Sequence, residues 1–135
     1  MPNRTNAPEK LTPTSATKKI ILVAEDDEGI GTMLADFISD ETSYAVFLVT
    51  NGRRALQVVQ QVKPSLFLLD YRLPSMTGLQ LYDQLQTIEA LKGIPTIMMS
   101  ANLPQAELAK RHIIGLKKPF DLDDLLDLIE KALGQ

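Results

Sequence analysis

Short apolar runs alternate with longer amphipathic stretches from residue 18 to the end of the chain. A continuous apolar run of this kind is typical of a strand that is covered on both faces. Apolar residues spaced three and four apart indicate helices between these runs. The predicted strands cover residues 20–24, 44–50, 66–69, 96–99 and 113–116. The predicted helices cover residues 27–38, 52–62, 77–89, 105–110 and 121–133.

The strict alternation of strands and helices predicts an α/β fold with a parallel sheet. Right-handed crossovers and a length of 135 residues favour a doubly wound, flavodoxin-like sheet of five strands in the order 2-1-3-4-5. Because ligand crevices of such sheets lie beyond the carboxyl ends of the strands, the residues after each apolar run are the candidates for function. In the first helix, one apolar stripe is expected to face the sheet; it comprises Ile30, Met33, Leu34, Phe37 and Ile38.

Composition excludes several classes of function. The chain has no cysteine, which excludes thiolate metal ligands and thiol nucleophiles. Its one histidine, His112, excludes multi-histidine metal sites and is expected at a helix end. Lys and Arg number 14 against 17 Asp and Glu, and this net charge of -3 argues against nucleic acid as a direct partner.

The chain also lacks the sequence features of a membrane or exported protein. Its apolar runs are far shorter than the roughly 20 residues that span a bilayer. The first residues contain no apolar secretory core. We therefore expect no membrane partner and a cytoplasmic location.

Residues 1–17 differ from the rest of the chain. They contain three prolines and four threonines without hydrophobic periodicity. Such a segment is predicted to be a disordered tail, with a docking peptide as the alternative. The remaining residues, 18–133, are predicted to form one domain.

Charged and hydroxyl residues follow four of the five predicted strands, namely Glu25 and Asp26, then Asp70, Ser100 and Lys118. Since the first and third strands are neighbours in the predicted order, three carboxylates are expected close together, beside a hydroxyl and an amine. Like charges raise one another's pKa and attract a cation. Mg²⁺ suits such oxygen ligands, and a carboxylate beside a metal, an amine and a hydroxyl is equipped for phosphoryl transfer.

Each of these residues also has a plain structural interpretation. Asp27 is expected to cap the first helix, and Lys117 to be a solvated charge. Ser100 alone would indicate a turn, and Lys118 alone a loop charge. The prediction of a site therefore depends on their joint placement at one edge of the sheet.

Four segments together resemble the receiver domain of bacterial two-component response regulators, over about residues 18–133. They are Ile-Leu-Val-Ala-Glu-Asp-Asp at 21–27, Leu-Leu-Asp-Tyr-Arg-Leu-Pro-Ser-Met-Thr-Gly at 68–78, Met-Ser-Ala at 99–101 and Lys-Lys-Pro-Phe at 117–120. The segment 68–78 is the most specific of the four. It places an aspartate at the end of a buried strand, then Leu-Pro, and then Met-Thr-Gly at the start of a helix.

The resemblance implies a role for each residue of the acidic cluster. Asp70 corresponds to the aspartate that accepts a phosphoryl group. Asp26 corresponds to a direct ligand of Mg²⁺, and Glu25 to one that acts mainly through water. The backbone carbonyl of Arg72 would be the third protein ligand.

The resemblance also assigns the residues opposite the acidic cluster. Ser100 occupies the position of a hydroxyl that hydrogen-bonds a phosphoryl oxygen. Lys118 takes the role of the invariant lysine, and a cis bond typically precedes the proline at position 119. Two departures concern the fourth helix. Gly115 stands where the family often has an aromatic switch residue, and only 18 positions (118 − 100) separate Ser100 from Lys118, so this helix should be short.

A histidine kinase or a histidine phosphotransfer protein is the partner that the resemblance implies. The domain would catalyse only its own phosphorylation and dephosphorylation, with binding of a downstream protein as the output. We expect a monomer or a homodimer that forms on phosphorylation. Two alternatives remain: an interaction module that is not phosphorylated, and a Mg²⁺-dependent aspartyl phosphatase. The phosphatase would need a second aspartate where Arg72 stands.

Overall fold

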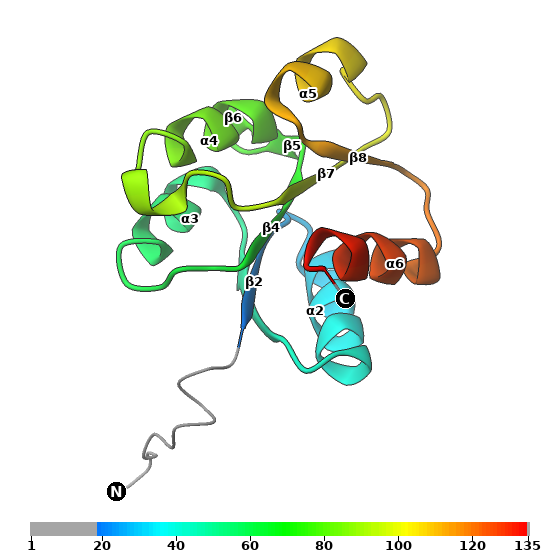
Figure 1. Ribbon diagram of the computed structural model, residues 1–135. Helices are drawn as coiled ribbons and strands as arrows, with labels where there is room; N and C mark the ends of the chain where they lie inside the picture. Colours follow the sequence, from blue (N-terminus) through cyan, green and yellow to red (C-terminus); the bar gives the residue numbers. More distant parts are fainter. Residues whose placement is uncertain (1–18, 135) are drawn as a thin grey trace, which may run out of the picture.

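The computed structural model describes residues 19–134, and the predicted tail at 1–17 lies outside this range. Five parallel strands form one sheet in the spatial order β3-β2-β4-β7-β8. In chain order this is 2-1-3-4-5, which confirms the predicted topology (Figure 1). The strands are β2 (Ile20–Ala24), β3 (Ala45–Val49), β4 (Leu66–Asp70), β7 (Thr96–Ser100) and β8 (Ile114–Lys117).

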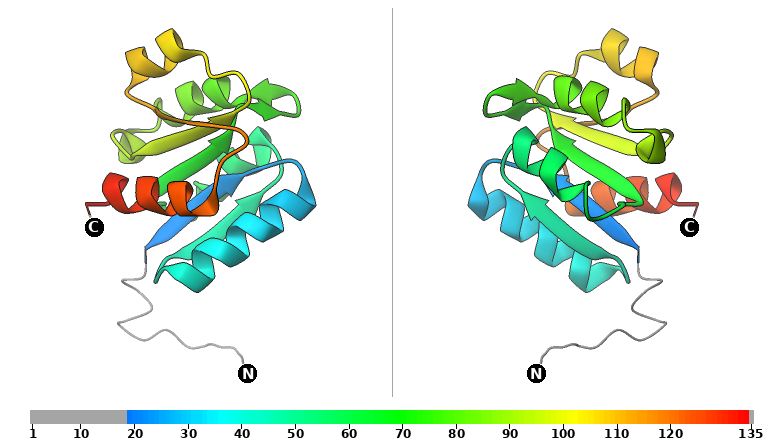
Figure 2. Two further views of the ribbon diagram at one scale, coloured as in Figure 1. Left: turned by 90° about the vertical axis from the view of Figure 1, so that its right-hand side faces the viewer. Right: turned by 90° about the vertical axis from the view of Figure 1, so that its left-hand side faces the viewer.

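Helices cover both faces of the sheet (Figure 2). One face packs against α2 (Glu28–Glu41) and α6 (Leu122–Ala132), which bury Leu34, Ile38, Leu125 and Ile129. The other face packs against α3 (Gly52–Val58), α4 (Gly78–Leu85), the short 3₁₀ helix η1 (Glu89–Leu91) and α5 (Gln105–Arg111). Strands β2, β4 and β7 are central, and all but one of their residues are buried. Within residues 19–134, no helix is long and apolar enough to cross a membrane.

Side-chain caps define where three of the helices begin. The Asp27 carboxylate accepts a hydrogen bond of 2.9 Å from the Ile30 amide, which confirms its expected role at the start of α2. Asn51 caps α3 in the same way. At α4, Thr77 and Gln80 form a reciprocal capping box with bonds of 2.8 and 3.1 Å.

Helices α3 and α4 end earlier than predicted. After Val58 the chain continues in irregular turns to Lys63, whose conformation is restricted because Pro64 follows it. After Leu85, the Thr87 hydroxyl donates to the Gln84 carbonyl at 2.7 Å and competes with the helical hydrogen bonds. Periodicity alone extends both helices too far, because apolar residues continue at helical spacing beyond the point where the backbone turns.

The predicted buried stripe of α2 is also too wide. Leu34 and Ile38 are fully buried, whereas Ile30 is 41% exposed and Met33 is 44% exposed. These two residues line a groove beside the loop that joins β8 to α6, and no element of the described chain covers them. The apolar surface at the start of α2 is therefore open to solvent.

A small hairpin that the sequence analysis did not predict follows β4. It consists of β5 (Arg72–Leu73) and β6 (Met76–Thr77), which pair in antiparallel fashion. Ser75 lies between them with φ of 70°, which fits the third position of a type II turn that has Pro74 at its second position. Strands of two residues carry no periodicity, so this hairpin left no signal in the hydrophobic pattern.

Helix α5 is short, as predicted, and an arginine holds it against α4. The Arg111 guanidinium donates two hydrogen bonds to the Asp83 carboxylate, at 2.8 and 3.0 Å. It also donates to the carboxylate and the carbonyl of Glu107, at 2.9 and 3.0 Å. The Tyr82 hydroxyl donates to the Arg111 carbonyl at 3.1 Å. His112 ends α5 in the left-handed conformation with φ of 59°, as expected for a residue at a helix end.

Replacing Asp83 by asparagine is expected to lower the free energy of unfolding by about 0.5–1 kcal/mol at pH 7. The loss is small because the Asp83 side chain is half exposed, so solvent screens its attraction to Arg111. Hydrogen bonds from Arg111 lower the pKa of Asp83, so the pair stabilises the folded state above the ordinary aspartate pKa. Its contribution should decline as the pH falls below about 4 and be lost once the pH is below the lowered pKa of Asp83 in the folded state. Urea unfolding at pH 7 and pH 3 measures this difference.

The exposed Asp36 of α2, which makes no ion pair within residues 19–134, offers the matched control. Asp36→Asn should leave the unfolding free energy nearly unchanged at both pH values. An Asp83→Asn defect that is as large at pH 3 as at pH 7 would rule out the ion pair as its cause.

Candidate functional site

The carboxyl ends of four strands meet at one edge of the sheet. Glu25 follows β2, Asp70 ends β4, Ser100 ends β7, and none of these three residues is more than 5% exposed. Lys118 follows β8 and is half-buried. Backbone hydrogen bonds continue past the strand ends, from Glu25 to Val49 and from Lys118 to Ser100, at 3.0 and 2.9 Å. The sheet itself therefore positions these residues.

Asp70 is the centre of the site, because each of its two carboxylate oxygens accepts a hydrogen bond. The Lys118 amine donates to its Oδ2 at 3.1 Å. The Arg72 backbone amide donates to its Oδ1 at 3.3 Å. The same Lys118 amine lies 3.6 Å from Oε1 of Glu25, so one cation bridges two buried carboxylates.

Three carboxylates converge beside this amine. Glu25, Asp26 and Asp70 each offer an oxygen, and these oxygens all lie within 4.8 Å of one another. Asp26 is exposed, so it faces the solvent side of the cluster. A pocket of about 320 Å³ opens over the cluster; it is lined by Glu25, Asp26, Asp70, Arg72, Ser100, Ala101 and Lys118. The structure thus brings together every residue that the sequence analysis selected as catalytic or metal-binding.

The buried Glu25 is electrostatically strained without a further positive charge. Burial raises the pKa of Glu25 to about 7; the Asp27 amide opposes this rise and the negative charge of Asp70 adds to it. Its Oε1 has no hydrogen-bond partner among the described residues. A buried carboxylate oxygen that lacks a donor fits a cation ligand, and oxygen-only donors suit Mg²⁺. The residues present are therefore compatible with a Mg²⁺ ion.

The Ser100 hydroxyl lines the pocket, but its hydrogen bonds are local. It donates to the Asn102 carbonyl at 3.0 Å and accepts from the Asn102 amide at 3.1 Å. The sequence predicted that a hydroxyl would lie at the end of this strand. The direction in which the hydroxyl points depends on the conformation of the following loop, which the sequence pattern does not give. A hydroxyl has a single proton to donate, so it would have to leave Asn102 to donate to a ligand in the pocket.

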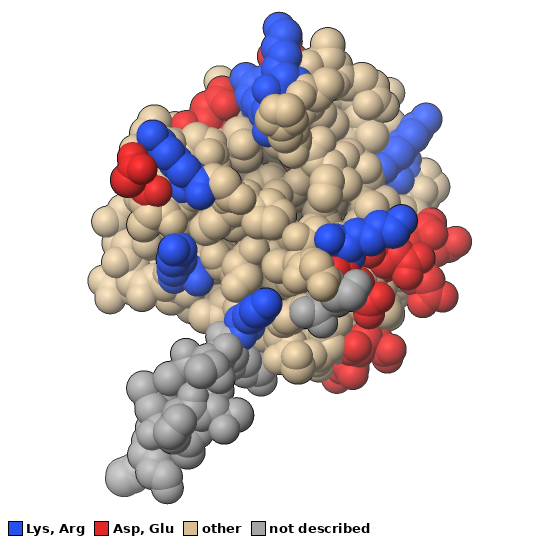
Figure 3. Space-filling view, viewed as in Figure 1, with Lys and Arg blue, Asp and Glu red and all other residues tan. Residues whose placement is uncertain are grey.

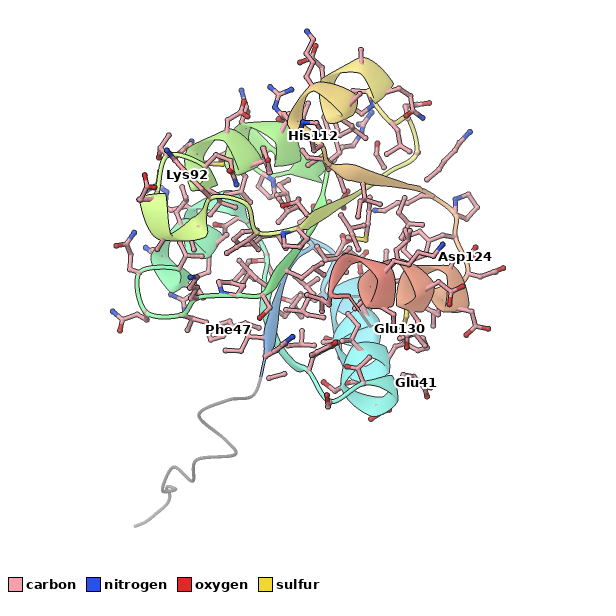
Figure 4. All side chains as sticks on the ribbon, in the orientation of Figure 1. Glu41, Phe47, Lys92, His112, Asp124 and Glu130 are labelled. Atoms are coloured by element: carbon pink, nitrogen blue, oxygen red, sulfur yellow. The ribbon has the colours of Figure 1, made fainter. Side chains whose placement is uncertain are left out.

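Several neighbouring residues lie outside the site. Asp27 caps α2, and its backbone amide donates to Glu25 at 3.2 Å. Lys117 is exposed and does not line the pocket, as expected for a solvated charge. His112 stands at the end of α5, among helices that do not contribute to the pocket (Figure 4). The peptide bond between Lys118 and Pro119 is cis.

Gly78 is a residue of the site to which the sequence analysis gave no role. A Cβ atom at this position would lie 2.6 Å from the backbone oxygen of Asp70 and 3.1 Å from Cα of Tyr71. The Gly78 amide donates to the Tyr71 carbonyl at 2.7 Å and closes the loop beneath Asp70. One feature of the sequence could have indicated this close approach. A glycine stands at the start of a predicted helix although glycine has a low helix propensity.

The sequence of the chain matches the model of the response regulator receiver domain over residues 21–130. The chain belongs to this family. It is a receiver domain of two-component signalling, and the predicted fold class and family are both confirmed. The match covers four strands of the sheet completely, all of β2 except its first residue, and the four segments that carried the resemblance.

Similar proteins include regulators of very different length. The receiver domain is 31% identical over 117 residues to sporulation initiation phosphotransferase F of Bacillus subtilis, covering 84% of this chain and 92% of that protein. It is 34% identical over 112 residues to the transcriptional regulatory protein CrdR of Helicobacter pylori, covering 80% of this chain and 51% of that protein. The chain thus spans about half the length of the second relative.

Solved structures show the same fold. The chemotaxis response regulator CheY4 of Vibrio cholerae is 26% identical, with a TM-score of 0.79 over 87% of this chain and 100% of that chain. The receiver domain of the sensor histidine kinase PA1611 from Pseudomonas aeruginosa has a TM-score of 0.77 and 24% identity, over 87% of this chain and 99% of that chain. The PA1611 structure holds a magnesium ion coordinated in its active-site cleft.

Proposed function

We propose that Asp70 accepts a phosphoryl group from the phosphohistidine of a histidine kinase or a histidine phosphotransfer protein. The observation that carries the proposal is the Lys118 amine, 3.1 Å from the Asp70 carboxylate, in a pocket with two further carboxylates. Receiver domains take phosphoryl groups from such donors, and the sporulation relative is itself called a phosphotransferase. We also propose a cytoplasmic location for the domain, because histidine kinases use ATP and ATP is found in the cytoplasm.

The residues of the pocket have distinct roles in this reaction. An Asp70 oxygen attacks the phosphorus atom, the bond from phosphorus to the histidine nitrogen breaks, and the imidazole keeps that electron pair and takes up a proton. The Lys118 amine offsets the charge that gathers on the phosphoryl oxygens. The Ser100 hydroxyl would donate to one of these oxygens after leaving the Asn102 carbonyl, and the Arg72 amide, which now donates to Asp70, would donate to another. Hydrolysis of the aspartyl phosphate reverses the modification, so the domain catalyses only its own phosphorylation and dephosphorylation.

Mg²⁺ is the cofactor that this proposal requires. Asp26 and Asp70 would hold the ion with their carboxylates and Glu25 mainly through water, together with the backbone carbonyl of Arg72. When bound, Mg²⁺ reduces the repulsion between the carboxylates and the incoming phosphate. The Oε1 of Glu25, which accepts no hydrogen bond from the described residues, and the raised pKa of Glu25 support a second cation beside Lys118.

An apolar groove beside the pocket supports the proposal that the phosphoryl donor is a protein. A groove of about 460 Å³ adjoins the pocket and shares Ala101 and Lys118 with it. It is lined by the exposed apolar side chains of Ile30 and Met33 and by Phe120. A donor that brings a phosphohistidine to Asp70 would cover this groove and bury these side chains.

The charge of the surrounding surface indicates the chemistry of that donor. Acidic side chains gather over α2 and α6 (Figure 3). The exposed carboxylates of these two helices belong to Glu28, Asp36, Asp40, Glu41, Asp123, Asp124, Asp127 and Glu130. We therefore propose a donor surface with an apolar centre and basic residues around it, because complementary charge speeds association.

Acetyl phosphate and Mg²⁺ test the proposed function without knowledge of the natural donor. The intact mass of the protein should increase by one labile phosphoryl group after incubation with both reagents. The gain should disappear with EDTA or with Asp70→Asn. Asp27→Asn offers a matched control, because asparagine also caps helices well and Asp27 only begins α2.

The same experiment separates the alternatives. An interaction module that is not phosphorylated would gain no mass, and that result would overturn the proposal. A phosphatase would hydrolyse added phosphomonoesters with many turnovers, whereas this receiver domain should not. Arg72 stands where such a phosphatase would need its second aspartate.

A further inference from the structure

The two helices on one face of the sheet carry an unbalanced negative charge. Helices α2 and α6 present eight exposed carboxylates and a single cation, Lys131. None of these carboxylates forms an ion pair within residues 19–134. Helices α3, α4 and α5 on the other face carry four basic residues against two acidic ones, namely Arg53, Arg54, Lys110 and Arg111 against Asp83 and Glu107. A basic segment is therefore attracted to the α2–α6 face and not to the opposite face (Figure 3).

The last turn of α2 lacks the positive charge that a helix end favours. Asp40 and Glu41 lie in this turn, where the helix dipole is negative, and the turn contains no basic residue. Tyr44 follows closely and is only 6% exposed, and its hydroxyl has no hydrogen-bond partner among the described residues. Burial raises the pKa of this hydroxyl, and the negative charge of Glu130 adds to the rise. This end of the α2–α6 face is therefore suited to a positively charged partner.

Residues 1–18 join the domain at this same end. Both helices run antiparallel to the strands, so the last turns of α2 and α6 lie beside the start of β2 (Figure 2). The Lys19 carbonyl accepts a hydrogen bond of 2.8 Å from the Ala45 amide, which fixes the start of β2 next to the segment that follows α2. Any cation of residues 1–18 that lies near Lys19 is thus within reach of the last turn of α2.

The sequence of residues 1–18 is complementary in charge to the α2–α6 face. It contains three basic residues, Arg4, Lys10 and Lys18, against one acidic residue, Glu9. The sequence analysis gave a docking peptide as the alternative for this segment, and no step of the proposed phosphoryl transfer uses it. Its charge matches the only strongly acidic surface among the described helices.

The segment is also long enough to reach the apolar groove at the start of α2. Leu11 is its only branched aliphatic residue and stands eight positions (19 − 11) before Lys19. Eight extended residues span up to about 26 Å. Helix α2 has 14 residues and is about 21 Å long. Leu11 can therefore contact the exposed side chains of Ile30 and Met33 while Lys18 remains at the last turn of α2.

We propose that residues 1–18 dock along the α2–α6 face of their own domain. Lys18 lies beside the carboxylates in the last turns of the two helices, Lys10 lies beside those in their first turns, and Leu11 occupies the apolar groove. The docked segment covers the surface that the phosphoryl donor would use, so a protein donor must displace it before reaching Asp70. This consequence for the donor rests on the proposed function, whereas the docking itself does not.

A spin label tests the docking directly, because the chain has no cysteine and a single introduced cysteine is labelled alone. With a nitroxide on Thr12→Cys of the full chain, the amide signals of residues 28–34 and 122–125 should lose about half of their intensity or more, since a tethered segment acts at a high effective concentration. The amide signals of α3 and α5 should keep their intensity. In an equal mixture of spin-labelled protein and ¹⁵N-labelled protein without cysteine, the signals should stay sharp, because the contact is made within one chain.

Charge reversal tests why the segment docks. Lys10→Glu in the spin-labelled protein should restore most of the lost intensity, since like charges then face each other. Salt at about 1 M should act in the same direction, because it shortens the Debye length to about 3 Å. Lys63→Glu is the matched control, because this exposed lysine precedes β4 and its reversal changes the net charge equally. It should leave the broadening unchanged.

The outcomes separate this inference from the proposed function. Equal broadening on both faces of the sheet would overturn the docking, as would full broadening in Lys10→Glu. Broadening in the mixed sample would assign the segment to a second copy and overturn docking within one chain. All of these measurements use the unphosphorylated protein, so phosphoryl uptake from acetyl phosphate tests the proposed function independently of them.

Discussion

Replacing Lys118 by methionine should slow phosphoryl uptake from acetyl phosphate roughly a hundredfold or more. The Lys118 amine is 3.1 Å from Asp70 and 3.6 Å from Glu25, so it is placed to neutralise charge on an incoming phosphoryl group. Methionine retains most of the apolar stem that lines the adjoining groove and removes the charge. The rate of mass gain in the presence of saturating Mg²⁺ measures the effect.

Two further readouts show whether the Lys118 defect is electrostatic. Mg²⁺ should bind to Lys118→Met at least as tightly as to the wild type, because the three carboxylates lose a competing cation. Lys117→Met changes the neighbouring, exposed lysine and should leave phosphoryl uptake unchanged. Wild-type rates in Lys118→Met, or equal losses in both variants, would contradict the role given to this amine.

Replacing Gly78 by alanine should destabilise the protein by about 2–3 kcal/mol and abolish most of its phosphoryl uptake. The added Cβ would lie 2.6 Å from the Asp70 carbonyl oxygen, a distance that a carbon atom does not tolerate. The loop beneath Asp70 must then move away from the end of β4, and Asp70 moves with it. Urea unfolding and acetyl phosphate incorporation measure the two effects.

Gly31 provides the comparison for Gly78. A Cβ at Gly31 would also be crowded, at 3.0 Å, but its neighbour is the flexible side chain of Leu48. Gly31 lies inside α2, where alanine is the better helix former. Gly31→Ala should therefore change stability by no more than about 1 kcal/mol and leave phosphoryl uptake intact. A Gly78→Ala variant that behaved like Gly31→Ala would show that the close approach to Asp70 is unimportant.

The strands and their order could be predicted because burial on both faces requires continuous apolar runs. The predicted first strand, residues 20–24, coincides with β2 residue for residue. Since parallel strands end at a common edge, the same pattern also predicted that Glu25, Asp70 and Lys118 would lie together, and their distances agree with this expectation. Sequence position was sufficient for these residues because the sheet fixes where each one lies.

Features that depend on local backbone conformation could not be predicted. The Ser100 hydroxyl was predicted at the site, but its bonds to Asn102 depend on the turn of the following loop. The hairpin around Ser75 is too short to show periodicity. The exposure of Ile30 and Met33 depends on which elements cover the start of α2, and spacing along a helix carries no information about that.

Identification of the phosphorylated residue is the most direct test of the account. The protein would be incubated with acetyl phosphate and Mg²⁺, the acyl phosphate reduced with borohydride, and the resulting peptides sequenced by mass spectrometry. Homoserine, the reduced residue, is expected at position 70 alone. Modification of Asp26 or Asp27 in place of Asp70, or a stable phosphate on Ser100, would contradict it.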